Sequence, residues 1–469
     1  MSESVQSLRA KAFDTLFEGY DGPAFSVRLW DGWRWFSPGG GNPACTIVFY
    51  SVNAVQSMLA RPSEITLGEA FLSKELDVEG DIFSVFEVAE HILQCARSLR
   101  QRVPEIISGV FFEIGQWWRQ GKSHCLERDL AAISYHYDQP VDFYRPWLGE
   151  SLAYSCAYFQ SAADGIDVAQ NNKLDLICRK LRLRPGERFL DIGCGWGSLI
   201  LQAASAHDVY AQGITISRRQ AETAAARIKE AQLTQCCGVE LLDYRKAPER
   251  FPPFDKIASV GMFEHVGLRN LALYFETARR LLKPGGVFLN HGIARSPVPG
   301  NRGVSFLDRT ILPFLRGVFM LRPRNRSFID KYVFPDGELV TISQAMHAAE
   351  SAGFEVRDIE NLREHYELTL RCWVKGLKRN ADAVLKLVPE TTYRIWLLYL
   401  AGSAAAFRRG DIAVYQTLLS SPKHGNSGLP LRREDWYAES MVPAGSYALR
   451  LPRKTIEKPR MVPAQTLRR

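Results

Sequence analysis

The segment FLDIGCGWG at residues 189–197 constrains the fold of this chain more than any other feature. An apolar run of strand character leads into a GxGxG turn, and a helical pattern begins near Ser198. Glycines let a backbone approach a ligand closely, and a helix N-terminus offers free N–H groups to an anionic group. The segment therefore predicts a site for a nucleotide-containing cofactor. A tight strand-to-helix corner that binds nothing is the plainer alternative.

The surrounding region, from residue 174 to about 293, alternates apolar strand-like runs with helical runs. This alternation predicts an α/β fold with a doubly wound, mostly parallel sheet. A dinucleotide site would have a GxGxxG turn and an acidic residue about 20 positions later. Here the second predicted strand, 209–215, ends without a carboxylate, and Asp191 lies just before the turn. The pattern favours a nucleotide cofactor other than a dinucleotide.

Three parts of the chain differ in pattern, and 469 residues are enough for about three domains. Short β-rich runs over 25–81, followed by an amphipathic stretch over 83–99, indicate a small α+β module. Helical patterns continue from 381 to 419, and the Pro- and Arg-rich chain after Pro422 has no apolar periodicity, which predicts loose order. We expect an accessory domain, a catalytic domain and a basic tail, at residues 1–125, 126–422 and 423–469.

The composition limits the kinds of binding partner and the cellular compartment that we expect. The net charge of +8 favours an anionic partner, either a nucleic acid or a phospholipid surface, although a merely basic protein would show the same charge. The longest apolar stretch, 395–407, is broken by Gly402 and Ser403 and is shorter than the ~18 residues that span a bilayer, so we expect any membrane contact to be peripheral. Nine cysteines without a CxxC pair favour a reducing cytoplasm.

A series of longer motifs, in order along the chain, carries a resemblance to a known family. These are HYDQPVDFYRPWL, YSCAYF, LDIGCGWGSL, GITISRRQ, SVGMFEHVG, LKPGGVFLNHGI, FIDKYVFPDGEL and HYELTLRCW. The chain resembles S-adenosylmethionine-dependent methyltransferases, and more narrowly the cyclopropane-fatty-acyl-phospholipid synthase family. FSVRLWDG and LDVEGD resemble that family's accessory domain. The resemblance implies a class I methyltransferase fold, preceded by a domain of lipid-binding type.

The resemblance also implies where S-adenosylmethionine binds. Gly193 and Gly195 match the family's cofactor loop, and Tyr154 and Ser155 match residues near the methionine end. For Ile216 and Tyr244, ordinary core packing is an equal alternative. The full set of predicted cofactor-binding residues is Tyr154, Ser155, Asp191, Gly193, Gly195, Thr215, Ile216, Gln220, Asp243 and Tyr244.

The chemistry implied by the family requires a base. Attack of a cis alkene on a sulfonium methyl group creates a carbocation, and ring closure then removes one proton from that methyl. Aromatic faces stabilise a cation, so Tyr137 and Tyr154 are candidate π-donors. The resemblance assigns the role of base to a bound bicarbonate, held by Cys156, Glu264, His291, Tyr366 and the backbone of Ile293.

Each of these residues also has a plainer interpretation. Cys156, His291 and Tyr366, taken singly, are typical of ordinary buried side chains. Glu264 differs, because GMFEHVG places a carboxylate at the end of an apolar run, where the cleft of an open parallel sheet is expected. A further segment, 295–327, is longer than in many bacterial relatives. Its apolar run with arginines at both ends fits either an interfacial lipid contact or a helix packed on the core.

We therefore expect a cytoplasmic enzyme, peripheral on the inner face of the cell membrane. It would transfer a methylene group from S-adenosylmethionine to the cis double bond of an unsaturated phospholipid acyl chain, forming a cyclopropane. The alternatives are a fatty-acyl C-methyltransferase with a methyl-branched or methylene product, and a related small-molecule methyltransferase. The sequence lacks the Asn/Asp-Pro-Pro-Tyr motif of a nucleic-acid methyltransferase. A non-catalytic lipid-binding protein would be expected to have lost Glu264 or the glycines, and this chain keeps them. The expected partner is an anionic bilayer surface, with no nucleic acid and no metal, and a homodimer is compatible with the sequence.

Overall fold

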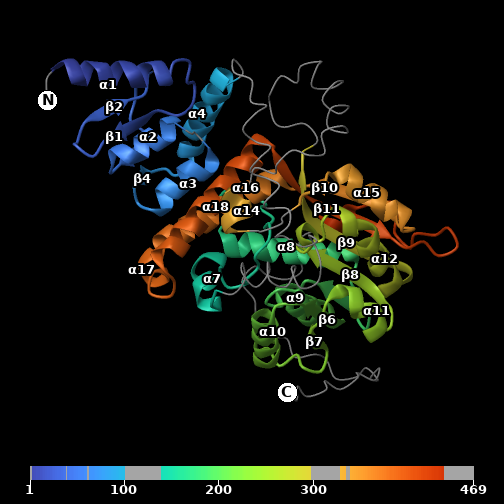
Figure 1. The fold of residues 1–469 in the computed structure, drawn as a ribbon. Coiled ribbons are helices and arrows are strands. Elements are labelled where there is room, and N and C mark those ends of the chain that lie inside the picture. The colour runs from blue at the N-terminus through green and yellow to red at the C-terminus, as the bar shows by residue number, and fades with distance from the viewer. Residues whose placement is uncertain are drawn as a thin grey trace, which may run out of the picture.

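A computed structural model shows an N-terminal domain and a larger C-terminal domain (Figure 1). The structure describes residues 3–38, 40–60, 63–100, 139–296, 328–333 and 338–437. Predicted features at 101–138, most of the 295–327 segment and the chain after 437 lie outside these ranges.

The N-terminal domain is the predicted α+β module. Its four strands pair in the order β2-β1-β3-β4. Alternation buries Cys45, Ile47 and Phe49 of β3 on one face, where the helices cover them. The elements are α1 (Glu3–Leu16), β1 (Phe25–Arg28), β2 (Arg34–Phe36), β3 (Cys45–Phe49), α2 (Val52–Ala60), α3 (Glu64–Leu72), β4 (Leu76–Gly80) and α4 (Ser84–Arg100).

The C-terminal domain is built on a seven-stranded sheet in the order β10-β11-β9-β8-β5-β6-β7. All neighbours are parallel except those of β11, which runs antiparallel to both β9 and β10, so the predicted mostly parallel sheet is confirmed. The strands are β5 (Arg188–Ile192), β6 (Tyr210–Thr215), β7 (Cys237–Leu241), β8 (Phe254–Val260), β9 (Leu282–Arg295), β10 (Glu355–Asn361) and β11 (Ile412–Ser420).

Helices cover both faces of this sheet. One buried cluster packs α8 and α9 against one face, and another packs α12 and α15 against the other. The α-helices are α7 (Val141–Leu148), α8 (Ile166–Leu181), α9 (Ser198–His207), α10 (Arg218–Glu230), α11 (Ala247–Arg250), α12 (Leu271–Leu281), α14 (Phe328–Tyr332), α15 (Ile342–Ser351), α16 (Arg363–Arg379), α17 (Ala381–Val384) and α18 (Glu390–Arg409). Short 3₁₀ turns are η1 (Tyr244–Lys246), η2 (Phe263–His265), η3 (Leu268–Asn270) and η4 (Glu434–Trp436). The doubly wound architecture is thus confirmed.

The prediction of helical structure through residue 419 is wrong. Helix α18 ends at Arg409, and the following segment is strand β11. Its sequence, IAVYQTLLS, is almost continuously buried because it lies between β9 and β10 in the sheet. A buried central strand has a continuous apolar sequence, and hydrophobic periodicity alone does not distinguish such a sequence from a buried helix.

The prediction of loose order from residue 422 onward is wrong as far as Tyr437. The Trp436 side chain is 2% exposed and packs with the cluster that covers α8. The Arg182 guanidinium lies 5.2 Å from the Trp436 ring centroid, and its Nε bonds the Asp435 carboxylate at 2.7 Å. One buried aromatic residue therefore fixes this segment to the domain, although its sequence has no apolar period.

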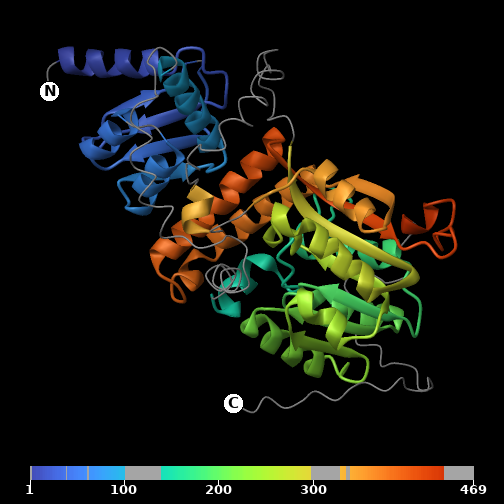
Figure 2. The same cartoon turned by 45° about the vertical axis from the view of Figure 1, so that its right-hand side comes forward.

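The two domains pack together along α18 (Figure 2). The buried Arg394 of α18 donates hydrogen bonds to the carbonyls of Phe71, at 2.8 Å, and Leu76, at 3.2 Å. A single cluster of buried side chains runs from the N-terminal sheet into α16 and α18. Among the helices that the structure describes, none has the length and apolarity of a membrane span.

Candidate active site

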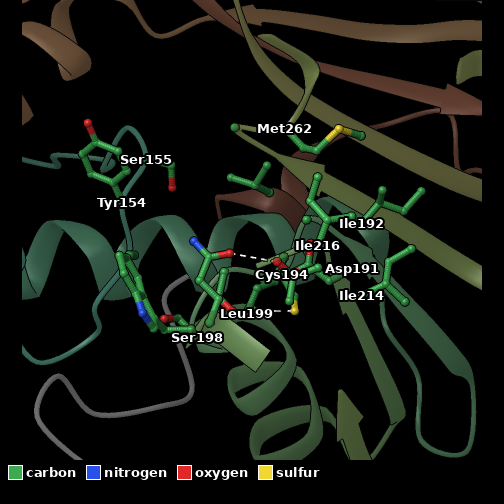
Figure 3. Close-up of a pocket in the computed structure, with 18 of the residues that line it drawn as sticks. Tyr154, Ser155, Asp191, Ile192, Cys194, Ser198, Leu199, Ile214, Ile216 and Met262 are labelled. Carbon is green, nitrogen blue, oxygen red and sulfur yellow. Dashed lines mark hydrogen bonds between the residues drawn. The ribbon is translucent and has the colours of Figure 1, made fainter. Parts of the chain in front are cut away.

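A pocket lies at the carboxyl ends of β5, β6 and β8, where open α/β sheets bind their ligands. All ten residues predicted to bind the cofactor line it. Figure 3 shows Tyr154 and Ser155 on one side of the pocket, and Asp191, Ile214 and Ile216 on the other. The fold thus brings together residues that are up to 90 positions apart, from Tyr154 to Tyr244.

The glycine turn after β5 forms one wall of this pocket. Gly193 and Gly195 have φ angles of 80° and 54°, in the left-handed region that favours glycine. A Cβ atom on Gly195 would meet no protein atom within 4 Å, so the space beside it belongs to the pocket. The N–H groups of Gly193 and Cys194 both bond the Ile214 carbonyl, at 2.9 and 3.0 Å, which ties the turn to β6.

The residues after β6 and β7 form the opposite end. The Thr215 hydroxyl donates to Gln220 Oε1 at 2.8 Å, which joins the end of β6 to helix α10. The Asp243 carboxylate pairs with Arg245 at 2.7 Å. Tyr244 lines the pocket and also packs edge-on against Tyr274, so it belongs to both the pocket and the core.

A buried carboxylate and a buried amine form the floor. Asp191 is 2% exposed, and its Oδ1 has no hydrogen-bond partner within the described parts of the chain. Burial raises the pKa of Asp191 to about 7, against the attraction of Lys173. Lys173 donates to the Ser155 hydroxyl at 3.0 Å, and burial lowers its pKa to about 8. At neutral pH Asp191 is therefore protonated in about half of the molecules while Lys173 is mostly charged, and a charged ligand group would shift the pKa of either residue.

Glu264 lies beside this pocket, on turn η2 after β8. Its Oε1 accepts the Ile293 N–H at 2.8 Å. Its Oε2 is buried and lacks a partner among the residues that the structure describes. Burial raises the pKa of Glu264 to about 7. The carboxyl group therefore carries a proton in about half of the molecules at neutral pH and can then donate a hydrogen bond.

The tautomer of His291 follows from its neighbours. Lys180 is 1% exposed, pairs with Glu360 and donates to Gln416 Oε1 at 2.8 Å. Because Lys180 can only donate, the Gln416 amide nitrogen faces His291 Nδ1, at 3.2 Å. Burial, with Lys173 and Lys180 nearby, lowers the pKa of His291 to about 3, so the ring is neutral. A neutral ring that accepts at Nδ1 carries its proton on Nε2.

His291 Nε2 is a buried donor that has no partner in the described chain. Glu264 Oε2, when it is protonated, is a second such donor. His291 precedes Ile293 by two positions on β9, and Glu264 bonds the backbone of Ile293. Two unsatisfied donors thus occupy one end of β9, an arrangement that fits a small anion or another acceptor.

Cys156 and Tyr366 are connected to the strand beside this corner through Leu362, and the Cys156 thiol also donates to the Ala157 carbonyl at 3.2 Å. The Leu362 carbonyl accepts from the Cys156 thiol at 3.8 Å and from the Tyr366 N–H at 3.1 Å. Leu362 N–H bonds Val414, which is paired with Ile293 across β9 and β11. Burial raises the pKa of the Cys156 thiol well above its usual value, so the thiol is neutral. Tyr137, the other predicted π-donor, lies outside the described residues.

Sequence reasoning missed three polar residues of the site, namely Lys173, Lys180 and Gln416. The signal for the two lysines was that they occupy the buried face of α8, among Leu174, Ile177 and Leu181. A charged residue on an apolar helix face is unusual unless it is paired. Gln416 interrupts an apolar run in the same way.

Comparison with known proteins places this site in a family. The family model described as mycolic acid cyclopropane synthetase matches residues 124–417, and a domain of unknown function matches residues 12–99. A relative from Pseudomonas putida, named a probable fatty acid methyltransferase, is 39% identical over 88% of this chain and 95% of its own length. The cyclopropane-fatty-acyl-phospholipid synthase of Escherichia coli K12 is 36% identical over 61% of this chain and 66% of its own length.

Similar solved structures support the same family. The mycolic acid cyclopropane synthase CmaA1, complexed with SAH and CTAB, is 34% identical, with a TM-score of 0.54 over 62% of this chain and 97% of its own. Coclaurine N-methyltransferase, at 18% identity and a TM-score of 0.56, shares the fold alone. The chain therefore belongs to the cyclopropane synthase family and is an S-adenosylmethionine-dependent methyltransferase.

Proposed function

We propose that this enzyme transfers a methylene group to the cis double bond of an unsaturated phospholipid acyl chain, forming a cyclopropane. The observation that carries the proposal is the pair of buried polar atoms, Glu264 Oε2 and His291 Nε2, that lack partners among the described residues. A methyltransferase acting on an amine needs no such pair, because the nitrogen lone pair attacks directly. Ring formation on a carbon chain must also remove a proton.

The pocket residues fit S-adenosylmethionine. When bound, this cosubstrate supplies a methyl group on a sulfonium, which an alkene can attack. The unpartnered Asp191 Oδ1 suits the ammonium of the methionine part, and that positive charge would favour the ionised carboxylate. The open space at Gly195 lets the ligand approach the backbone. Ile216 and Tyr244 offer an apolar surface to the adenine.

The corner around β9 fits bicarbonate. Protonated Glu264 and His291 Nε2–H are neutral donors, which suit an anion that would supply the base for proton loss. Because the pKa of Glu264 is raised to about 7, the carboxyl group is protonated in about half of the molecules at neutral pH and is then a donor, not a base. The residues of this corner therefore act by holding and orienting the anion, and Tyr154 lines the adjoining pocket with an aromatic face for the developing cation.

The acceptor is tested by the lipids of a host that expresses the protein. We expect mass spectrometry to show acyl chains heavier by one CH₂ that resist ozonolysis, since a cyclopropane lacks the alkene that ozone cleaves. Lipids from cells with the Glu264→Gln variant serve as the control.

A second product has support from the Pseudomonas putida relative, whose name specifies a fatty acid methyltransferase. A chain that gains CH₂ but remains cleavable by ozone would establish a methylene-type product and exclude the cyclopropane. Unchanged host lipids, with active cofactor binding, would exclude both.

We also propose peripheral binding to anionic bilayers, supported by the net charge of +8. Vesicle binding should strengthen with anionic lipid, by roughly 1 kcal/mol per engaged Lys or Arg, and weaken with salt. Equal binding to neutral and anionic vesicles at low salt would contradict this.

A further inference from the structure

A buried tryptophan from the C-terminal turn η4 covers the charged group of Lys180. The Lys180 ammonium lies 5.6 Å from the centroid of the Trp436 ring, and the two residues are 1% and 2% exposed. An ammonium has three N–H donors. Two of them bond Glu360 and Gln416, and the aromatic ring is a further favourable contact for the positive charge. The ring therefore helps to keep water away from this ammonium.

The turn η4 is held over Lys180 by packing and by cations. The indole N–H of Trp436 is buried and has no hydrogen-bond partner within the described ranges of the chain, which lowers stability. Two more cations, Arg182 and Arg433, lie 5.2 and 5.6 Å from the centroid of the same ring. Arg182 also pairs with Asp435 at 2.7 Å. The ring thus occupies this position although its own N–H gains no hydrogen bond there.

Lys180 determines which way the Gln416 amide points. Because an ammonium only donates, it bonds the amide oxygen, at 2.8 Å, and leaves the amide nitrogen for His291 Nδ1, at 3.2 Å. A reversed amide would place its NH₂ group against the ammonium, where both groups are donors. Its oxygen would then favour a proton on His291 Nδ1 and leave a lone pair on Nε2. That lone pair would repel an anion in the corner around β9, whereas an N–H attracts it.

We propose that Lys180 and the turn η4 are positioning elements of the active site, which hold His291 in the tautomer that donates from Nε2. The inference rests on the proposed function, in which His291 helps to hold an anion. It gives a part in the reaction to Trp436, which does not line the cofactor pocket and lies beyond the residues that the family model matches. Water admitted to the ammonium would compete with the Gln416 oxygen for its N–H groups and would release the amide to turn.

The test weakens this series of contacts at two points in the full-length protein. Lys180→Met removes the ammonium and keeps an unbranched side chain of similar length. Trp436→Ala admits water to the ammonium, and Trp436→Phe restores an aromatic ring. Leu429→Ala is the matched control, because Leu429 packs against the same buried cluster from the same C-terminal segment but offers the ammonium no ring. S-adenosylhomocysteine binding by calorimetry and the melting temperature verify that each variant is folded.

The first measurement is the ¹⁵N spectrum of His291 in the absence of lipid. In the wild type and in Leu429→Ala we expect one tautomer, with the proton on Nε2. In Lys180→Met and in Trp436→Ala the form with the proton on Nδ1 should be detected beside it, and Trp436→Phe should largely suppress that form. Unchanged His291 resonances in both Lys180→Met and Trp436→Ala would overturn the inference.

The second measurement is turnover of an unsaturated phospholipid, with each substitution alone and combined with Gln416→Leu. Lys180→Met should lower kcat roughly tenfold and Trp436→Ala roughly threefold, with the KM for S-adenosylmethionine unchanged. Since both act through the Gln416 amide, neither should lower kcat further when Gln416→Leu is already present.

Two results would separate this inference from its alternatives. Losses that simply add to that of Gln416→Leu would show that Lys180 and Trp436 act only on stability, and would overturn the inference. The ¹⁵N spectrum needs no turnover. A change of the His291 tautomer without any loss of kcat would therefore support the positioning by Lys180 and Trp436 and contradict the proposed function.

Discussion

The cofactor pocket and the corner around β9, where Glu264 and His291 would hold an anion, are adjacent, yet they are built in different ways. We call the second region the anion corner. The glycine wall of the pocket is one local segment, Gly193–Gly197, held by its own backbone conformation and by bonds to β6. The corner is a set of side chains from α8, η2, β9 and β11, held by the bonds among them. Substitutions in the glycine wall should therefore abolish cofactor binding, whereas substitutions in the anion corner should reduce turnover.

The largest effect should come from Gly195→Val. A branched side chain would occupy the open space beside the turn and would force an unfavourable left-handed φ of 54°. We expect no measurable S-adenosylmethionine binding by calorimetry, with the melting temperature confirming a folded protein. Wild-type affinity in this variant would show that the turn does not contact the ligand.

The Glu264→Gln variant should show that cofactor binding and turnover depend on different regions. The amide can still accept from Ile293 and can still donate to an anion, but unlike the carboxyl group it can neither take up nor release a proton. We expect cofactor affinity within about twofold of the wild type, and a loss of turnover on the order of 10² to 10⁴-fold, typical of damaged proton transfer.

Bicarbonate provides the control for that variant. Wild-type enzyme prepared in carbonate-depleted buffer should be stimulated by added bicarbonate, and Glu264→Gln much less so. Full turnover by the variant, with no bicarbonate response in either form, would make Glu264 a structural carboxylate.

A smaller loss should follow Gln416→Leu, which removes the donor that fixes the His291 tautomer. We expect turnover to fall on the order of tenfold, since one buried hydrogen bond contributes about 1–3 kcal/mol when its partner is left unsatisfied. The ¹⁵N resonances of His291 should report a mixture of tautomers. Thr417→Val, which removes a neighbouring bond to Asn290 on the same strand, is the matched control and should leave the His291 resonances unchanged.

The smallest effect concerns stability against pH. Burial raises the pKa of Glu264 in the folded chain to about 7 from its usual 4.5, so the folded state holds the proton more tightly. The contribution of this group to the free energy of unfolding is complete below pH 4.5 and is lost as the pH rises through 7.

Glu264→Gln lacks this titration. Between pH 5 and 8 the wild type should therefore lose more stability than the variant, by on the order of 1 kcal/mol in urea denaturation. Parallel pH profiles for the two proteins would mean that the carboxyl group is not desolvated.

The same contrast explains what the sequence could predict. The turn after β5 was predictable because its strand, glycines and helix are consecutive. The ten cofactor residues were predicted from the family resemblance, and eight of them lie at or shortly after the ends of β5, β6 and β7. The role of Gln416 was not predictable, because this residue lies 125 positions from His291 and contacts it only where β11 pairs with β9. The wrong helix through residue 419 concealed that pairing. Lys180 was hidden too, because its partners Glu360 and Gln416 come from distant strands.

The position of β11 also has a consequence for biosynthesis. A nascent chain emerges from the ribosome N-terminus first, and β9 is released long before β11, the strand that covers it on one side. Until residues 412–420 emerge, β9 has an open edge, which is a template for wrong pairing. The same insertion delivers Gln416 to His291, so the anion corner is completed at the last step of sheet assembly. A ribosome stalled before residue 416 would therefore carry a chain with the cofactor turn but without a finished catalytic corner.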